Sequence, residues 1–388
     1  MTDTDSFSSQ LFSSLKIRAE LLTSLDSLKY KIMTPIQAQS LPPILAGDVV
    51  IGQAKTGSGK TAAFGLGLLN QLDATRFHVQ SLVLCPTREL ADQVATEIRN
   101  LARAIPNVKV LTLCGGVPFG PQAGSLEHGA HIVVGTPGRI EDHLNRGTLH
   151  FKGLTALVLD EADRMLDMGF QDSVDAIVDE LPSPRQTLLF SATFPAQIKS
   201  MSKRIMRQPV MIEVAATHTA DSIEQHFYQT THDQRMDALR LLLLQHSAES
   251  TLVFCNLKRE TEEIASALNA DGFSAIALNG DLEQRDRDQA LVRFGNKSAS
   301  ILIATDVASR GLDIDALDVV INYQTVHDPE TYVHRIGRTG RAGAKGVACT
   351  LFTDKDSYHM ALLKDLLGAD IDLSGEPLPS TSLLNKQA

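Results

Sequence analysis

The chain contains the octapeptide Ala54-Lys55-Thr56-Gly57-Ser58-Gly59-Lys60-Thr61. It follows the apolar run 49–51 and precedes a helix-forming stretch, 62–72. A strand, a glycine-containing loop and a helix in this order predict a phosphate-binding cradle, because the loop N–H groups and the helix N-terminus present positive charge to an anion. Lys60 would contact the outer phosphates, and Thr61 would supply a hydroxyl for Mg²⁺. The generic pattern begins with Gly where this chain has Ala54, so the rest of the sequence must support the assignment.

Length and composition are those of an ordinary globular protein. The chain has 388 residues, of which 43% are hydrophobic and 21% charged, which predicts two or three domains. The net charge of −10 argues against attachment to nucleic acid by a bulk positive field, but it permits a local basic groove. No apolar run is long enough to span a membrane, and the polar segment 1–10 lacks the features of a secretion signal. We therefore expect a cytoplasmic protein.

Apolar runs alternate with helical patterns along most of the chain. Runs that are apolar throughout and separated by helices predict α/β domains with parallel sheets covered by helices on both faces. We expect helices over 11–28, 36–45 and 89–105. The strands are predicted at 49–52, 81–85, 108–113, 131–135, 155–160, 187–190 and 210–214, and then at 225–230, 251–255, 274–278, 300–304, 318–323 and 346–352.

The two series of strands predict two similar domains. We place the first at 1–214, with the phosphate loop, and the second at 223–373, without one. Residues 215–222 are small and polar without periodicity, which predicts a linker. The Gly-, Pro- and Ser-containing segment 374–388 predicts a mobile tail.

A metal-binding acid should follow a strand near the phosphate loop. The apolar run 157–159 ends in Asp160-Glu161-Ala162-Asp163, at the edge of the sheet where α/β proteins bind ligands. Asp160 would hold Mg²⁺ through water, and Glu161 would orient and deprotonate an attacking water. The alternative is a solvated acidic turn, which the nearby phosphate loop disfavours.

Positive charge is also needed where charge develops on the γ-phosphate. Arg338 and Arg341 lie three residues apart in the predicted second domain. They predict an arginine finger supplied within one chain, and the alternative is a basic surface patch.

With these motifs the chain resembles the DEAD-box ATP-dependent RNA helicases from about residue 12 to about 353. Residues 160–163 form the tetrapeptide that names the family, and Ala54 is usual in its phosphate loop. The segment 280–289 is most similar to the bacterial DbpA-type members. The other family motifs, in order, are Thr34-Pro35-Ile36-Gln37, Pro86-Thr87-Arg88-Glu89-Leu90-Ala91, Gly115-Gly116, Thr136-Pro137-Gly138-Arg139, Ser191-Ala192-Thr193, Val253-Phe254-Cys255-Asn256, Gln284 with Arg287, 304–307 leading to 310–313, and 334–341.

The resemblance implies two RecA-like domains that bind ATP with Mg²⁺. It implies that Gln37 reads the adenine edge and that Phe12 stacks on the ring, although Phe12 is also compatible with simple packing. Gly311 and Asp313 would meet the ribose and phosphates. The nucleotide-binding set is then Phe12, Gln37, Ala54, Lys55, Thr56, Gly57, Ser58, Gly59, Lys60, Thr61, Gly311 and Asp313.

The resemblance also implies an RNA surface that contacts the backbone and therefore does not read sequence. Its residues would be Thr87, Arg88, Gly116, Thr136, Gly138, Arg139, Asn256, Gln284, Arg287 and Thr305. Coupling between ATP and RNA would involve Asp163, Ser191, Thr193 and His334. Without the family, Ser191 and Thr193 would be interpreted as a strand-end turn.

Three features depart from the family pattern. Lys29 stands where Gly usually precedes Tyr30, and Gln324 stands where Asp usually follows Tyr323. DbpA-type members carry a further RNA-binding domain after the helicase core, whereas this sequence ends after a short tail, so specificity for one structured RNA is not carried over.

We therefore expect an RNA-dependent ATPase that hydrolyses ATP to ADP and phosphate and locally unwinds short RNA duplexes. The resemblance suggests a role in ribosome assembly, with ribosomal RNA or pre-ribosomal particles as partners, for a monomer that does not act on membranes. One alternative is an ATP-dependent RNA clamp, and another is a DNA translocase.

Overall fold

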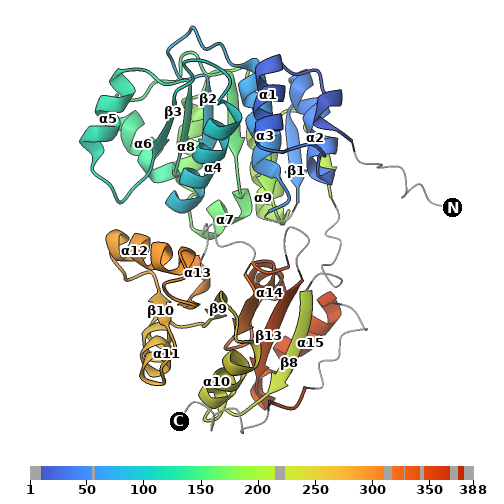
Figure 1. The fold of residues 1–388 in the computed structure, drawn as a ribbon. Coiled ribbons are helices and arrows are strands. Elements are labelled where there is room, and N and C mark those ends of the chain that lie inside the picture. Colours follow the sequence, from blue (N-terminus) through green and yellow to red (C-terminus); the bar gives the residue numbers. More distant parts are fainter. Residues whose placement is uncertain are drawn as a thin grey trace, which may run out of the picture. The chain divides into compact units, whose positions relative to one another are not determined.

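The computed structural model describes residues 10–54, 57–214, 223–309, 317–326, 328–340, 345–367 and 375–379. Contacts between residues divide the chain into two units, Met1–Ala216 and Thr217–Ala388. Figure 1 shows a sheet in each unit with helices packed on both of its faces. The linker predicted at 215–222 lies outside the described residues.

The first unit is built on a seven-stranded parallel sheet in the order β3-β4-β2-β5-β6-β1-β7. Its strands are β1 (Val50–Gln53), β2 (Ser81–Leu84), β3 (Val110–Leu113), β4 (Ile132–Gly135), β5 (Ala156–Leu159), β6 (Gln186–Ser191) and β7 (Val210–Glu213). Its helices are η1 (Phe12–Ser14), α1 (Ala19–Ser27), α2 (Pro35–Ala46), α3 (Lys60–Gln71), α4 (Arg88–Leu101), α5 (Phe119–Glu127), α6 (Pro137–Asn145), α7 (Ala162–Asp167), α8 (Gln171–Asp179) and α9 (Ala196–Ile205).

Alternate strand residues of the first unit enter two separate cores. Val50 and Val83 pack with helices α1 to α4 on one face. Ile51 and Leu82 pack with helices α6 to α9 on the other. This is the burial on both faces that continuous apolar strands require, because successive side chains of a strand point to opposite sides.

The second unit has a six-stranded parallel sheet in the order β10-β11-β9-β12-β13-β8. Its strands are β8 (Ile223–Gln229), β9 (Thr251–Phe254), β10 (Ala275–Leu278), β11 (Ile301–Ala304), β12 (Val319–Asn322) and β13 (Gly346–Phe352). Its helices are α10 (Arg235–His246), α11 (Lys258–Ala270), α12 (Gln284–Gly295), α13 (Asp306–Ser309), α14 (Pro329–Ile336), η3 (Asp354–Asp356) and α15 (Ser357–Leu367). The predicted strands of both units are confirmed to within two residues at each end.

Three predicted segments differ from the structure. The helix expected over 89–105 ends at Leu101 and is followed by turns. The helix expected over 11–28 begins only at Ala19, because Leu11 instead forms an antiparallel bridge with Ile32 and η1 occupies 12–14. Part of the expected mobile tail, 375–379, lies against β8. There the Glu376 N–H donates to the Phe227 carbonyl, and Leu378 packs against the core of the second unit. The rest of that tail lies outside the described residues.

Lys29, which departs from the family pattern, keeps the backbone geometry of a glycine. It follows α1 with a φ of +62°. The N–H groups of Lys29 and Tyr30 donate back to the carbonyls of Asp26 and Leu25, which closes the helix end. A non-glycine residue is strained in this left-handed conformation, whereas glycine adopts it freely.

We predict that Lys29→Gly stabilises the protein by about 0.5–1 kcal/mol, because relief of this strain outweighs the greater entropy of glycine in the unfolded chain. Thermal or urea unfolding of the two proteins measures the difference. The control is Lys31→Gly, at an exposed position without a positive φ, which should be neutral or destabilising. Equal losses of stability in both variants would contradict the strain at Lys29.

Candidate functional site

The phosphate loop joins β1 to α3 and is held from two sides. Gly57 and Gly59 have φ values of +77° and +92°. The buried Lys60 opens α3, and its Nζ donates to the Ala54 carbonyl at 2.7 Å. Thr61 is half-buried in the first turn of the helix, while Lys55 and Thr56 lie outside the described residues. The loop therefore surrounds a buried ammonium group, as a phosphate site requires.

Gln37 connects the start of α2 to the phosphate loop. Its Oε1 accepts from the Thr34 N–H at 2.9 Å, and its Nε2 donates to the Gly59 carbonyl at 3.0 Å. A Cβ atom at Gly59 would lie 2.4 Å from Gln37 Nε2, so a side chain there would displace the amide. The structure thus brings together two motifs that are 22 residues apart in the sequence.

Asp160 and Glu161 follow β5 and are buried, with exposures of 3% and 4%. Burial raises the pKa of Asp160 to about 7, with the charge of Glu161 acting in the same direction and that of Lys60 opposing it. Glu161 has a φ of +52°, and its carboxylate lies 3.0 Å from the guanidinium of the buried Arg164. Two carboxylates and an ammonium group therefore share a site with little water, and such a site would accept a divalent cation.

The contact expected between the third acid and β6 is present. Asp163 Oδ2 accepts from the N–H and the hydroxyl of Thr193, and the Asp163 N–H donates to the Ser191 hydroxyl. Burial would raise the pKa of Asp163, but these hydrogen bonds and the charge of Lys60 outweigh it, so the pKa lies below its usual value. Asp163 therefore ties the acid cluster to the segment after β6 as an ionised group.

Phe12 is buried in the first core with 3% exposure and lies parallel to Tyr30, with ring centroids 6.5 Å apart. The structure shows the packing role of this ring. Its stacking on adenine stays a prediction.

The proposed RNA residues of the first unit all follow the carboxyl ends of strands. Thr87 caps α4 by accepting from the Leu90 N–H, and Arg88 lies 3.8 Å from Asp92. Gly116 and Gly138 are exposed in the loop after β3 and at the start of α6, and Thr136 precedes α6. Exposed glycines and helix N-termini at one sheet edge offer N–H groups to a phosphate backbone.

Arg139 differs from its neighbours because its side chain is only 13% exposed. One terminal nitrogen donates to Gln122 Oε1 and the other to the Val117 carbonyl, both at 3.0 Å. The guanidinium therefore contacts protein groups around the Gly115-Gly116 loop.

Sequence reasoning missed Arg335 of α14, whose guanidinium connects the carboxyl ends of β9, β11 and β12. Arg335 is 2% exposed and forms a two-point ion pair with Asp306, with both distances at 2.7 Å. It also donates to Asn322 and to the proposed RNA residue Asn256. The available signal was an arginine inside a helical run between His334 and Ile336, where a buried guanidinium demands partners.

The other proposed site residues of the second unit make local hydrogen bonds. Gln324, which departs from the family pattern, accepts from the Asn256 N–H and donates to Glu260. Thr305 is buried and accepts weakly from the Ala308 N–H. Gln284 donates to Asp288, and Arg287 donates to the carbonyls of Asn279 and Ala308.

Among the arginine-finger residues, the structure places only Arg338. It follows α14 and is 6% exposed, while His334 lies within the helix and is half-buried. Arg341, Gly311 and Asp313 lie outside the described residues.

The described residues fit a nucleotide with its magnesium ion. Ser58 Oγ is buried in the phosphate loop without a hydrogen-bond partner among the described residues. An orphaned hydroxyl, a buried ammonium group and a protonatable buried aspartate are together suited to phosphate oxygens and a hydrated cation. By contrast, no three His, Cys, Asp or Glu residues in the described part of the chain form a ready metal-binding cluster.

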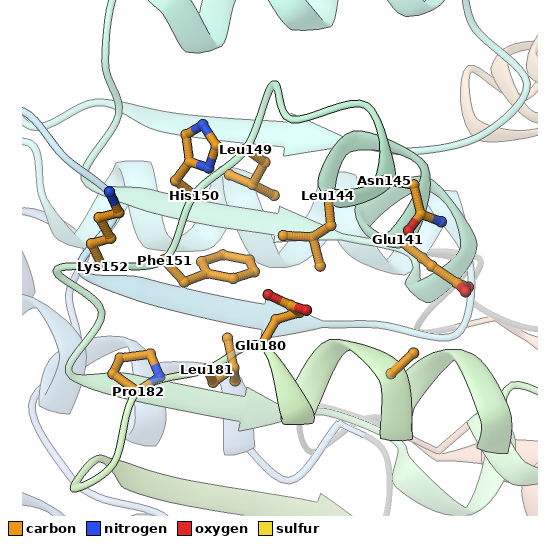
Figure 2. A pocket seen from close by; sticks show the side chains of 11 residues that line it. Glu141, Leu144, Asn145, Leu149, His150, Phe151, Lys152, Glu180, Leu181 and Pro182 are labelled. Carbon is orange, nitrogen blue, oxygen red and sulfur yellow. The ribbon is translucent and has the colours of Figure 1, made fainter.

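A separate cavity of about 490 Å³ lies between α6, α8 and the segments that precede β5 and β6. Figure 2 shows Phe151, Leu144 and Leu181 lining it, with Glu141, Glu180 and Lys152 around them. It lies toward the amino ends of these strands, so it does not belong to the site at the carboxyl edge.

None of the helices in the described residues is long and apolar enough to cross a membrane.

Comparisons with known proteins agree with this geometry. Residues 34–201 match the DEAD/DEAH box helicase family, and 234–343 match the helicase conserved C-terminal domain. The chain is 54% identical to the ATP-dependent RNA helicase DbpA of Escherichia coli K12, over 93% of this chain and 79% of that protein. It is 40% identical to the DEAD-box ATP-dependent RNA helicase CshA of Bacillus subtilis 168, over 97% of this chain and 76% of the relative.

Solved structures also resemble the chain. Saccharomyces cerevisiae Dbp5 bound to RNA and ADP BeF3 superposes with a TM-score of 0.85 at 29% identity, over 97% of this chain and 99% of the other. A DEAD box protein from Methanococcus jannaschii gives a TM-score of 0.54 at 40% identity, over 92% of this chain and 97% of the other.

We predict that Asp160→Asn makes the nucleotide-free protein more stable above neutral pH. The folded-state pKa of Asp160 is raised to about 7, so the wild type loses stability as the pH rises from the unfolded value of about 3.9 through 7. Asparagine cannot ionise, so the variant does not lose this stability as the pH rises. With a chelator present, the stability advantage of the variant over the wild type should grow by about 2–3 kcal/mol between pH 5 and pH 8. Unfolding measured across this range tests the expectation, and a pH-independent difference would contradict it.

Proposed function

This chain belongs to the DEAD-box ATP-dependent RNA helicases, and from that membership we propose that it couples ATP hydrolysis to the local separation of short RNA duplexes. The observation that carries the proposal is the buried group formed by Lys60, Asp160 and Glu161 beside a loop that Gln37 holds. It joins a phosphate site, a cation site and a general base, which hydrolysis of a nucleoside triphosphate requires.

The ATP-binding role is assigned to the loop between β1 and α3. Loop N–H groups and Lys60 would hold the β- and γ-phosphates, and the Gln37 amide, which can both donate and accept, would select adenine. Thr61 and Asp160 would hold Mg²⁺, which supplies charge neutralisation on the phosphates when it is bound. Because the pKa of Asp160 is raised to about 7, its carboxyl group would release a proton when the cation arrives.

Glu161 is assigned the role of general base. Its carboxylate is fixed by the ion pair with Arg164 and by the position of Glu161 at the start of α7. It would orient the attacking water in line with the γ-phosphate and take its proton. Arg338 and Arg341 would stabilise the charge that develops on the transferred phosphoryl group.

The RNA-binding role is assigned to the loops at the carboxyl edges of the two sheets. Their N–H groups and threonine hydroxyls contact a sugar–phosphate backbone without reading bases, and 2′-hydroxyl contacts would distinguish RNA from DNA. A surface shaped for one bent strand cannot hold a regular duplex, so tight binding of one strand would expel its partner. Asp163, Ser191, Thr193 and His334 would transmit the state of the ATP site.

We extend the proposal to the biological setting. The resemblance of the segment 280–289 to the DbpA-type members supports a role in ribosome assembly for a cytoplasmic monomer, with ribosomal RNA or pre-ribosomal particles as partners. The backbone contacts of the core predict little selectivity for RNA sequence.

Two other functions use the same motifs. An ATP-dependent RNA clamp would bind RNA with ATP but would not turn over strands when the protein is substoichiometric. A DNA translocase would be stimulated equally by DNA. The Gln37 contact with the phosphate loop and the intact tetrapeptide at 160–163 favour the RNA helicase over the translocase.

We predict that single-stranded RNA stimulates ATP hydrolysis and that DNA of the same sequence stimulates it far less. Glu161→Gln should lower the RNA-stimulated kcat by about 100-fold or more, because the general base is lost. Arg338→Ala should lower it by about 1,000-fold if this side chain acts as the finger. Phosphate release with matched RNA and DNA measures all three effects.

A matched control is Glu180→Gln, which also removes a carboxylate from the first unit but beside the cavity at the opposite sheet edge. It should leave the stimulated kcat within about twofold. Full turnover in Glu161→Gln would refute the assignment of the base, and equal stimulation by DNA would refute the RNA specificity.

A further inference from the structure

Gln122, on α5, makes three hydrogen bonds while it is only 9% exposed. Its Nε2 donates to the Cys114 carbonyl at 3.0 Å. Its Oε1 accepts from Arg139 Nη1 at 3.0 Å and lies 3.1 Å from His143 Nε2. Gln122 lies outside the family motifs, yet two of its three partners belong to motif regions: the loop after β3 and the start of α6.

The chemistry of these partners fixes how the amide is oriented. A carbonyl can only accept and a guanidinium can only donate, so the amide nitrogen must face Cys114 and the amide oxygen must face Arg139. The same oxygen faces His143, so the His143 Nε2 carries a proton and donates it. His143 Nδ1 lies 2.8 Å from the Thr148 hydroxyl, which also lies 3.2 Å from the His143 carbonyl oxygen. This assignment of the proton follows from the hydrogen-bond network.

His143 is held in one orientation by its surroundings. It is fully buried, and its ring stacks on Phe119 with centroids 4.2 Å apart and planes 21° apart. Burial, followed by the charge of Arg139, lowers the pKa of His143, so the ring is neutral at physiological pH. The Phe119 ring also contacts Arg146, whose guanidinium carbon lies 4.3 Å from the centre of the ring.

These contacts converge on one short loop. Gln122 holds the Cys114 carbonyl at its start, and Arg139 holds the Val117 carbonyl at its end, at 3.0 Å. Between them lie the exposed Gly115 and Gly116, the latter with a φ of +76°. Glycines have no side chain that could hold the loop in place, so its shape depends on the groups that bind its two end carbonyls.

We propose that Gln122 and His143 are positioning residues that set the shape of the 114–117 loop, and hence the affinity of the first unit for RNA. The proposal rests on the proposed function, in which Gly116 and Arg139 belong to the RNA surface. The hydrogen bond from His143 orients the Gln122 amide. That amide in turn binds the Cys114 carbonyl and the Arg139 guanidinium, which binds the Val117 carbonyl. Neither residue touches RNA or nucleotide in this arrangement.

The test measures the RNA concentration that gives half-maximal ATP hydrolysis, together with kcat at saturating RNA and the KM for ATP. Gln122→Met is close in size but loses all three hydrogen bonds. We expect the half-saturating RNA concentration to rise about tenfold, as the loss of a buried hydrogen-bond network implies, with kcat and the KM for ATP unchanged within twofold. His143→Met should act in the same direction, and the double variant should be no worse than Gln122→Met, because the two residues act in series.

Conservative variants separate positioning from general destabilisation. His143→Gln can still donate a hydrogen bond near the Nε2 position and should recover most of the RNA affinity. Gln122→Glu keeps both acceptor contacts but places a carboxylate oxygen against the Cys114 carbonyl oxygen, so it should raise the half-saturating RNA concentration by disturbing only the Cys114 end of the loop. It also serves as the test if Gln122→Met does not fold.

The matched control is His131→Leu. His131 is the other fully buried histidine of this sheet region and bonds to the Lys109 N–H and the Ala74 carbonyl, but it precedes β4, at the opposite end of the strand from Arg139. Its loss should lower the melting temperature without changing the half-saturating RNA concentration.

Unchanged RNA saturation in folded Gln122 and His143 variants would overturn the proposal, as would a fall in kcat alone. A rise of the same size in His131→Leu would also overturn it, because the effect would then reflect stability. If the wild type itself were not stimulated by RNA, the proposed function would fail and the positioning role would fail with it. If RNA stimulates the wild type but the variants have the same half-saturating RNA concentration, only the positioning role is refuted.

Discussion

A parallel sheet brings the carboxyl ends of all its strands to one edge, and both units of this protein depend on that constraint. The phosphate loop follows β1, the acids follow β5, and the proposed RNA loops follow β2, β3 and β4. Each of these groups comes from a separate part of the sequence, and the sheet alone makes them neighbours. The strands can be short and uniformly apolar because their role is to hold these loops in register.

Each unit places charged groups where water is scarce. In the first unit Lys60 faces Asp160, and Arg164 faces Glu161, while in the second Arg335 is enclosed by Asp306 and amide oxygens. Burying charge is unfavourable unless partners compensate, so these groups constrain the surrounding loops strongly. At Asp160, burial outweighs the charge of Lys60 and raises the pKa to about 7. A bound cation would favour the ionised carboxylate.

The strands, the phosphate loop and the acids could be predicted because each is a local pattern of consecutive residues. The contacts of Arg335 with Asp306, and of Gln122 with His143, could not, because each joins segments that only the folded sheet brings together. The leucines of segment 11–18 have helical spacing, which favours a helix, whereas the bridge between Leu11 and Ile32 decides the conformation of this segment. Arg139 shows another limit of prediction from sequence. Its motif predicts a site, but the sequence does not show that its guanidinium contacts protein groups such as the Val117 carbonyl.

The short segment 375–379 has a consequence for how molecules of this protein meet one another. β8 is the last strand in the order of the second sheet, so one side of it would present unpaired N–H and C=O groups. Glu376 pairs with Tyr228 there, its carboxylate contacts His226, and Leu378 packs on the core beneath. Where an edge strand is already partnered, as β8 is at Phe227 and Tyr228, it cannot pair there with a strand from a neighbouring molecule. Residues 375–379 therefore shield this part of the edge from intermolecular strand pairing, a consequence separate from catalysis and RNA binding.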